Sequence, residues 1–104
     1  MVEYRTEKEW VEEYRKTFDV VGQDLVWKIS TSQKIKVGSF AGYREYGGKH
    51  LVQLHGRRIA VPRVIYAIIH GEIPEYLIHL DNNTQNNHPN NLFDWKKGKK
   101  KNDR

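Results

Sequence analysis

A histidine opens the most unusual stretch of this chain, residues 79–92, which reads HLDNNTQNNHPNNL. Three pairs of asparagine follow it, at 82–83, 86–87 and 90–91. Asparagine tolerates left-handed backbone geometry and bonds back to nearby N–H groups, so the composition predicts a tight, self-bracing loop. His79 follows a short apolar run, and an imidazole held on such a support can act as a general base on water. The alternative is a histidine that only completes the hydrogen bonds of the loop.

The charge balance indicates an anionic partner. The 104 residues include 18 Lys and Arg against 13 Asp and Glu, a formal net charge of +5, which favours nucleic acid through attraction and counterion release. Positive charge is concentrated in the last ten residues, WKKGKKKNDR, directly after the asparagine-rich stretch. A solvated terminus is the alternative explanation for such a tail. The candidate DNA-binding residues are Lys96, Lys97, Lys99, Lys100, Lys101 and Arg104.

The absence of cysteine limits the metals that the chain can bind. Without thiolates, disulfides and cysteine-ligated zinc are excluded. A metal would have to be held by His, Asp, Glu or Asn side chains and water. These ligands suit a hard cation such as Mg²⁺.

Elements that could position the loop can be predicted from the residue pattern. Thr6 and Glu9 have the spacing of a capping box, and apolar residues then recur at helical spacing, so residues 7–18 should form an amphipathic helix. LVWKI at 25–29 is of strand type. Residues 37–61 are punctuated by glycine and should form a small antiparallel meander.

The meander should have one buried face. Val52 and Leu54 alternate with polar neighbours and should point inward, and a turn is expected at Gly56-Arg57. Pro62 should open a largely buried helix that Gly71 ends.

The last part of the pattern completes an α+β prediction for one domain. Residues 75–80 should form a brief strand or buried turn, and residues 90–97 a final helix. We expect a single domain over 1–95 followed by a basic tail, 96–104. No apolar run is long enough to span a bilayer, and MVEYRTEKEW is too charged for a secretory signal, so a cytoplasmic location is expected.

The order of the residues in the asparagine-rich stretch resembles the core of the HNH endonucleases of the phage and intron-homing type. Their usual form is His-x-Asp-Gly-Asn-x-x-Asn-Asn-x-x-x-Asn-Leu. The positions that match in register are His79, Asp81, Asn86, Asn87, Asn91 and Leu92. The layout upstream is also similar, with a Trp-containing strand, a glycine-punctuated sheet and a helix ending in Gly-Glu-x-Pro, so that the resemblance covers roughly residues 18–95.

This resemblance implies a C-terminal ββα-metal fold, in which a hairpin and a helix hold one divalent cation against the scissile phosphate of DNA. His79 would deprotonate the attacking water, and Asn91 would brace the hairpin and orient that histidine through its carbonyl or side chain. Asp81, Asn86 and Asn87 would shape the loop. Lysines nearby would hold the DNA backbone without reading its sequence.

Two positions depart from the family pattern at the metal site. Ile78 stands where the family usually has a metal-binding residue before the histidine, and Lys100 stands near the expected position of the last ligand. Asn102 or Asp103 could substitute only if the tail bends differently. Loss of metal ligands commonly removes catalysis while leaving a fold intact.

Two functions therefore remain open at the level of sequence. One is a small, phage-encoded HNH endonuclease that cuts or nicks DNA with Mg²⁺ or another divalent metal. The other is an inactive HNH-like scaffold that binds DNA or inhibits a host protein, in the cytoplasm of that host. An unrelated RNA-binding or structural module is supported only by charge and aromatic content.

Overall fold

The N-terminal helix forms where the sequence predicts it. In the computed structural model, which describes residues 5–96, helix α1 spans Glu7–Thr17. The Thr6 hydroxyl accepts the backbone N–H of Glu9, and the Glu9 carboxylate accepts the backbone N–H of Thr6, so the predicted capping box is present. The helix ends one residue earlier than expected, because Phe18 is already extended and starts a strand.

A two-stranded hairpin follows α1 directly. Strand β1, Phe18–Val21, pairs antiparallel with β2, Asp24–Trp27, around Gly22 at φ +64°. The sequence predicted the second strand and missed the first. The reason is Phe18, which continues the helical spacing of α1 yet is fully buried from a strand.

The predicted meander is a three-stranded sheet of β3, Tyr43–Arg44, β4, His50–Leu54, and β5, Arg57–Ala60. Val52 and Leu54 are buried, as predicted. The turn lies one residue earlier than expected, at His55-Gly56, because both residues take positive φ, at +51° and +77°, and Arg57 already pairs with Leu54.

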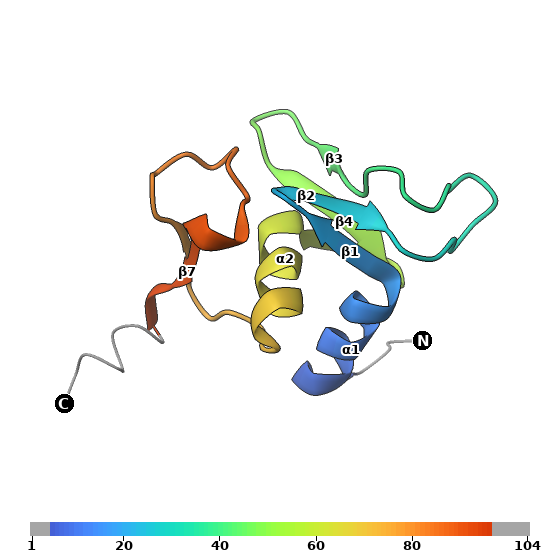
Figure 1. Ribbon diagram of the computed structural model, residues 1–104, viewed down its shortest axis with the longest axis horizontal. Coiled ribbons are helices and arrows are strands. Elements are labelled where there is room, and N and C mark those ends of the chain that lie inside the picture. The colour runs from blue at the N-terminus through green and yellow to red at the C-terminus, as the bar shows by residue number, and fades with distance from the viewer. Residues whose placement is uncertain (1–4, 97–104) are drawn as a thin grey trace.

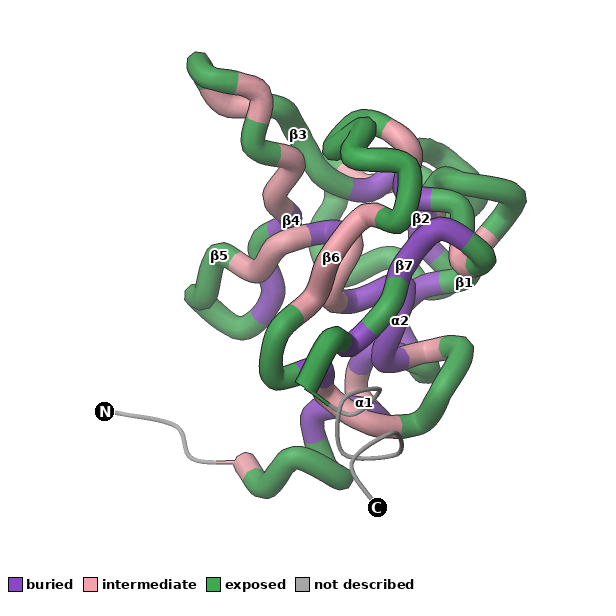
Figure 2. Tube along the Cα trace, turned by 90° about the vertical axis from the view of Figure 1, so that its left-hand side faces the viewer, coloured by how far each residue is buried: buried purple, intermediate pink, exposed green. Residues whose placement is uncertain are grey.

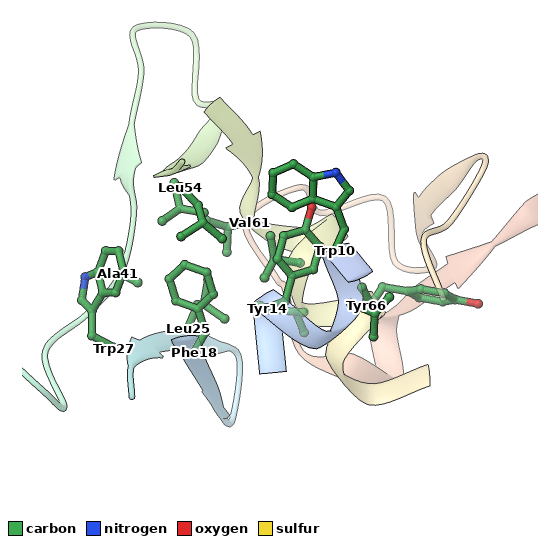
Figure 3. Packing of buried hydrophobic residues seen from close by; sticks show 14 of the residues in the cluster. Trp10, Tyr14, Phe18, Leu25, Trp27, Ala41, Leu54, Val61 and Tyr66 are labelled. Carbon is green, nitrogen blue, oxygen red and sulfur yellow. The ribbon is translucent and has the colours of Figure 1, made fainter. Parts of the chain in front are cut away.

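Helix α2, Val61–His70, lies at the centre of the structure, between the hairpin and sheet on one side and the C-terminal segment on the other (Figure 1). Gly71 ends it in left-handed geometry, with its N–H donating to Ala67, as predicted. The core that it forms with α1 and the strands is rich in aromatic side chains (Figure 3). No helix within residues 5–96 is long and apolar enough to cross a membrane.

The C-terminal segment is a second hairpin, and the helix predicted over 90–97 is wrong for most of its length. Strand β6, Leu77–His79, pairs antiparallel with β7, Leu92–Asp94, after a short 3₁₀ turn, Pro89–Asn91. Within the described part of the predicted range, only Trp95 and Lys96 are α-helical. The Asp94 carboxylate accepts the backbone N–H groups of Glu75 and Tyr76, a tertiary contact that outweighs the helical character of the local sequence. The chain is therefore an α+β fold, as predicted.

Candidate active site

His79 lies at the end of a strand that is anchored to the core. It pairs with Leu92 across the β6–β7 hairpin, and Leu92 is buried in the hydrophobic core. The Leu80 N–H donates to the Asn91 carbonyl at 2.8 Å, which extends the pairing one step past His79. The backbone of the histidine is thus held from both sides.

Asp81 is the centre of the hydrogen bonds in the loop that follows. Its Oδ1 accepts the backbone N–H of Asn83 and the Nδ2 of Asn91, each at 2.8 Å, and its Oδ2 accepts the Nδ2 of Asn86 at 3.1 Å. These bonds, the one from Asn86 first, lower the pKa of Asp81 because they favour its charged form.

Asn91 closes the loop from its other end. Its Oδ1 accepts the Asp81 N–H at 3.0 Å, and its Nδ2 also donates to the Asn86 carbonyl at 2.9 Å. The side chain is 9 % exposed. The resemblance implies that this residue orients His79. Asn91 accepts the backbone N–H groups of Leu80 and Asp81, which lie beside the histidine, so any such effect runs through the main chain.

The other asparagines also bond within the loop. Asn82 is left-handed at φ +62°, and its N–H donates to the His79 carbonyl. The Oδ1 atoms of Asn83 and Asn86 accept the N–H groups two residues further on, at Gln85 and His88. The loop therefore satisfies its own backbone donors in the way that short asparagine side chains allow.

Asn87 contacts the imidazole itself. Its side chain is 1 % exposed, and its Oδ1 lies 2.8 Å from Nε2 of the half-buried His79. Because an amide oxygen can only accept, Nε2 carries the proton in this contact. In the neutral ring Nδ1 is then the nitrogen with a free lone pair. From the sequence, Asn87 is expected only to shape the loop, because its position eight residues after His79 carries no signal for this contact.

His79 lines a groove of about 480 Å³. Thr84 of the loop also lines it, and the rest of the lining comes from the β3–β4 turn, the start of β4, the end of β5 and the start of α2. Figure 2 shows β6 and β7 running in front of the sheet at this face, with the β3–β4 turn projecting from the protein. The groove thus places the histidine next to residues some thirty positions earlier in the chain.

Lys49 and His50 line this groove and were missed by sequence reasoning. Lys49 is exposed, and no ion pair binds it within residues 5–96. Burial, and after it the positive charge of Arg44, lower the pKa of His50. The Nδ1 of His50 is buried without a hydrogen-bond partner in the described chain. Two glycines followed by Lys-His are the only local signal that could have singled these residues out.

The described residues do not supply enough side-chain ligands to hold a divalent cation without other ligands. No cluster of three or more His, Asp or Glu side chains that could hold a metal is present in residues 5–96. Ile78, on the strand before His79, presents only hydrocarbon. The weak metal candidates Asn102 and Asp103, and Lys100, lie outside the described residues. We therefore assign no step to a cation.

Most of the basic tail also falls outside the described residues. This applies to the predicted DNA contacts at Lys97, Lys99, Lys100, Lys101 and Arg104. Lys96 is exposed, and its backbone N–H donates to Asp94 Oδ1 at 3.2 Å. Because Lys96 is exposed, its side chain faces solvent two residues after β7 ends at Asp94.

Comparison with known proteins identified no relative of this chain. No protein-family model, no curated protein and no solved structure matches the chain.

Proposed function

We propose that this chain is a phage-encoded HNH-type DNA endonuclease in which His79 is the general base for phosphodiester hydrolysis. The main support for this proposal is the tautomer of His79 together with its position in a groove. Its Nε2 donates to the buried Asn87 Oδ1, which leaves Nδ1 as the acceptor, and the residue lines a groove. A fixed imidazole with one free lone pair is what deprotonation of water requires.

The chemistry assigned to the residues is limited to proton transfer, positioning and charge. Nδ1 of His79 would take a proton from water as the water oxygen attacks phosphorus, the bond from phosphorus to the 3′ oxygen would break, and the departing 3′ oxygen would take a proton from solvent. Asn87 would hold the ring and stabilise the imidazolium through Nε2. Lys49 would bring positive charge to the phosphate in the same groove.

The resemblance also implies Mg²⁺ or another divalent metal, which would supply charge stabilisation at the phosphate when bound. Because residues 5–96 offer no complete ligand set, this part of the proposal is a requirement to be tested. A cytoplasmic site of action, in a host cell, belongs to the same proposal.

A second function is favoured by Ile78. A hydrocarbon side chain at the position of an expected ligand suits a scaffold that kept the HNH-like hairpin and lost hydrolysis. Such a scaffold would bind DNA, or a host protein that it inhibits. Both functions predict an intact loop around Asp81, but only the endonuclease predicts cleavage of DNA.

Nicking of a supercoiled plasmid separates the two. The protein is incubated with plasmid in Mg²⁺ or Mn²⁺, in EDTA, and as the His79→Ala variant. His70→Ala is the matched control, because His70 is an exposed histidine at the far end of α2. Metal-dependent nicking that disappears only in His79→Ala supports the endonuclease. Absence of nicking, or equal nicking by the His79→Ala variant, refutes the catalytic function.

A further inference from the structure

The segment from Lys28 to Lys49 carries a positive charge that the rest of the protein does not neutralise. It contains five cationic residues and one acidic residue, Glu45, which pairs with Arg58 at 3.1 Å. Lys28 is held near Asp19 at 3.9 Å. The other four cations are exposed and form no ion pair within residues 5–96; they are Lys34, Lys36, Arg44 and Lys49.

Exposed aromatic residues are interleaved with these cations along the segment. Phe40 is 75 % exposed, Tyr43 is 42 % exposed, and Tyr46 is fully exposed. A phenylalanine this exposed contributes little to the core, and because Phe40 shares a groove with the exposed ring of Tyr43, the two rings together indicate a contact surface. We refer to these cations and rings together as the basic–aromatic surface, which comprises Lys34, Lys36, Phe40, Tyr43, Arg44, Tyr46 and Lys49.

Part of this surface is a second groove. Lys34, Phe40 and Tyr43 line a depression of about 420 Å³ together with residues of β2 and β4. The β3–β4 hairpin supplies residues to this groove and also, through Lys49 and the glycines before it, to the groove of His79. A long ligand could therefore pass from one groove to the other across a single hairpin.

The pairing of cations with exposed rings favours one kind of nucleic acid. Lysine and arginine bind phosphates of any strand, whereas an aromatic ring binds a base by stacking on its face. In a duplex those faces are covered by neighbouring base pairs, and only unpaired bases offer them. Rings that stand free beside cations thus suit a single strand, and they do so with little dependence on sequence.

We propose that the basic–aromatic surface binds single-stranded DNA that leads away from the groove of His79, with phosphates on Lys34, Lys36, Arg44 and Lys49 and bases stacked on Phe40 and Tyr46. The choice of DNA rests on the proposed function. On this basis the preferred substrate is DNA with an unpaired segment beside the cleaved phosphate.

Binding is tested by fluorescence anisotropy with a labelled 20-nucleotide DNA strand, its duplex and the RNA of the same sequence, all in EDTA. The single strand should bind more tightly than the duplex. Phe40→Ser combined with Tyr46→Ser should weaken single-strand binding at least about tenfold. The matched control is Val21→Ser, which removes an exposed apolar side chain from β1.

Salt titration tests the phosphate contacts separately. Lys34→Gln with Lys36→Gln should reduce the slope of log K against log salt by about 1.4, as expected for two lost contacts to a single strand. Lys8→Gln, an exposed lysine on α1, is the control and should leave the slope unchanged. Circular dichroism establishes that each variant is folded.

Three results would overturn this inference: tighter binding to the duplex or to RNA, unchanged binding by the double aromatic variant, or no binding to DNA at all. The last would point to a protein partner for the exposed rings. Binding is measured in EDTA and so does not depend on metal-dependent cleavage. Binding without plasmid nicking therefore refutes only the endonuclease, and nicking without single-strand binding refutes only this surface.

Discussion

Asn91 and Asp81 hold each other by two hydrogen bonds across ten residues of chain. The Asp81 N–H donates to Asn91 Oδ1 at 3.0 Å, and Asn91 Nδ2 donates to Asp81 Oδ1 at 2.8 Å. The contact joins the first residues after β6 to the last residue before β7. It therefore closes the loop as a ring, with the His79 backbone at its base.

Asn91→Ala should destabilise the protein by about 1–3 kcal/mol, because the buried Asn91 side chain is the hydrogen-bond partner of the Asp81 N–H, the Asp81 carboxylate and the Asn86 carbonyl, and all three bonds are lost. Urea unfolding measures the change. Asn90→Ala is the matched control, since Asn90 is an exposed neighbour for which only a backbone bond is seen. Equal stability of the two variants would contradict the closing role of Asn91.

Stability should fall in acid partly through Asp81. Its pKa is lowered by the bonds from Asn86, Asn83 and Asn91, so the folded state binds a proton less readily than the unfolded chain. The stabilisation is complete above the ordinary aspartate pKa of about 3.9 and is lost as pH falls through the lower folded value.

Urea unfolding of the wild type and of Asp81→Asn between pH 3 and 7 should show this. The variant should be less stable than the wild type near neutrality, and the two curves should converge toward pH 3. Glu12→Gln removes an exposed carboxylate of α1 and is the control for a change of charge alone. Parallel curves for the wild type and Asp81→Asn would contradict the expected linkage.

Asn87→Ala should lower the rate of plasmid nicking about 10- to 100-fold, if the proposed hydrolysis takes place, because the His79 ring loses the acceptor on Nε2. Asn87→Asp keeps an oxygen acceptor and should recover part of the rate. A purely structural role would give both variants the same rate once each is shown to be folded. kcat and KM should be measured separately, since the loss of a positioned base should lower mainly kcat.

The sequence predicted the elements whose signals are local. Helix α1 has a capping box and a regular apolar face, and α2 begins near Pro62 and ends at Gly71, so both are located to within about a residue. The loop of asparagines was likewise predictable, because Asn and Asp bond to backbone groups two residues away.

The remaining features depend on contacts between distant parts of the chain. Residues 92–94 lie in a sequence that predicts a helix, but they pair with β6. The Asp94 carboxylate accepts the N–H groups of Glu75 and Tyr76, nineteen and eighteen residues earlier. Lys49 and His79 meet at one groove although thirty residues separate them. No pattern within a single element could have predicted that meeting, and the same holds for the contact of Asn87 with the imidazole.

Gly42 and Gly47 offer a matched test of how tightly the β3–β4 hairpin is packed beside that groove. Both have φ +101°, but a Cβ on Gly42 would lie 2.8 Å from the Leu51 carbonyl oxygen and 2.9 Å from Val61 Cγ2, whereas a Cβ on Gly47 meets nothing within 4 Å. Gly47→Ala should therefore cost only the backbone strain of a positive φ, about 1–2 kcal/mol. Gly42→Ala should cost about 1–3 kcal/mol more, since the backbone of β4 and the start of α2 must move apart. Urea unfolding of the two variants gives the difference directly. Equal losses in the free energy of unfolding would mean that the hairpin can shift around Gly42 at little cost.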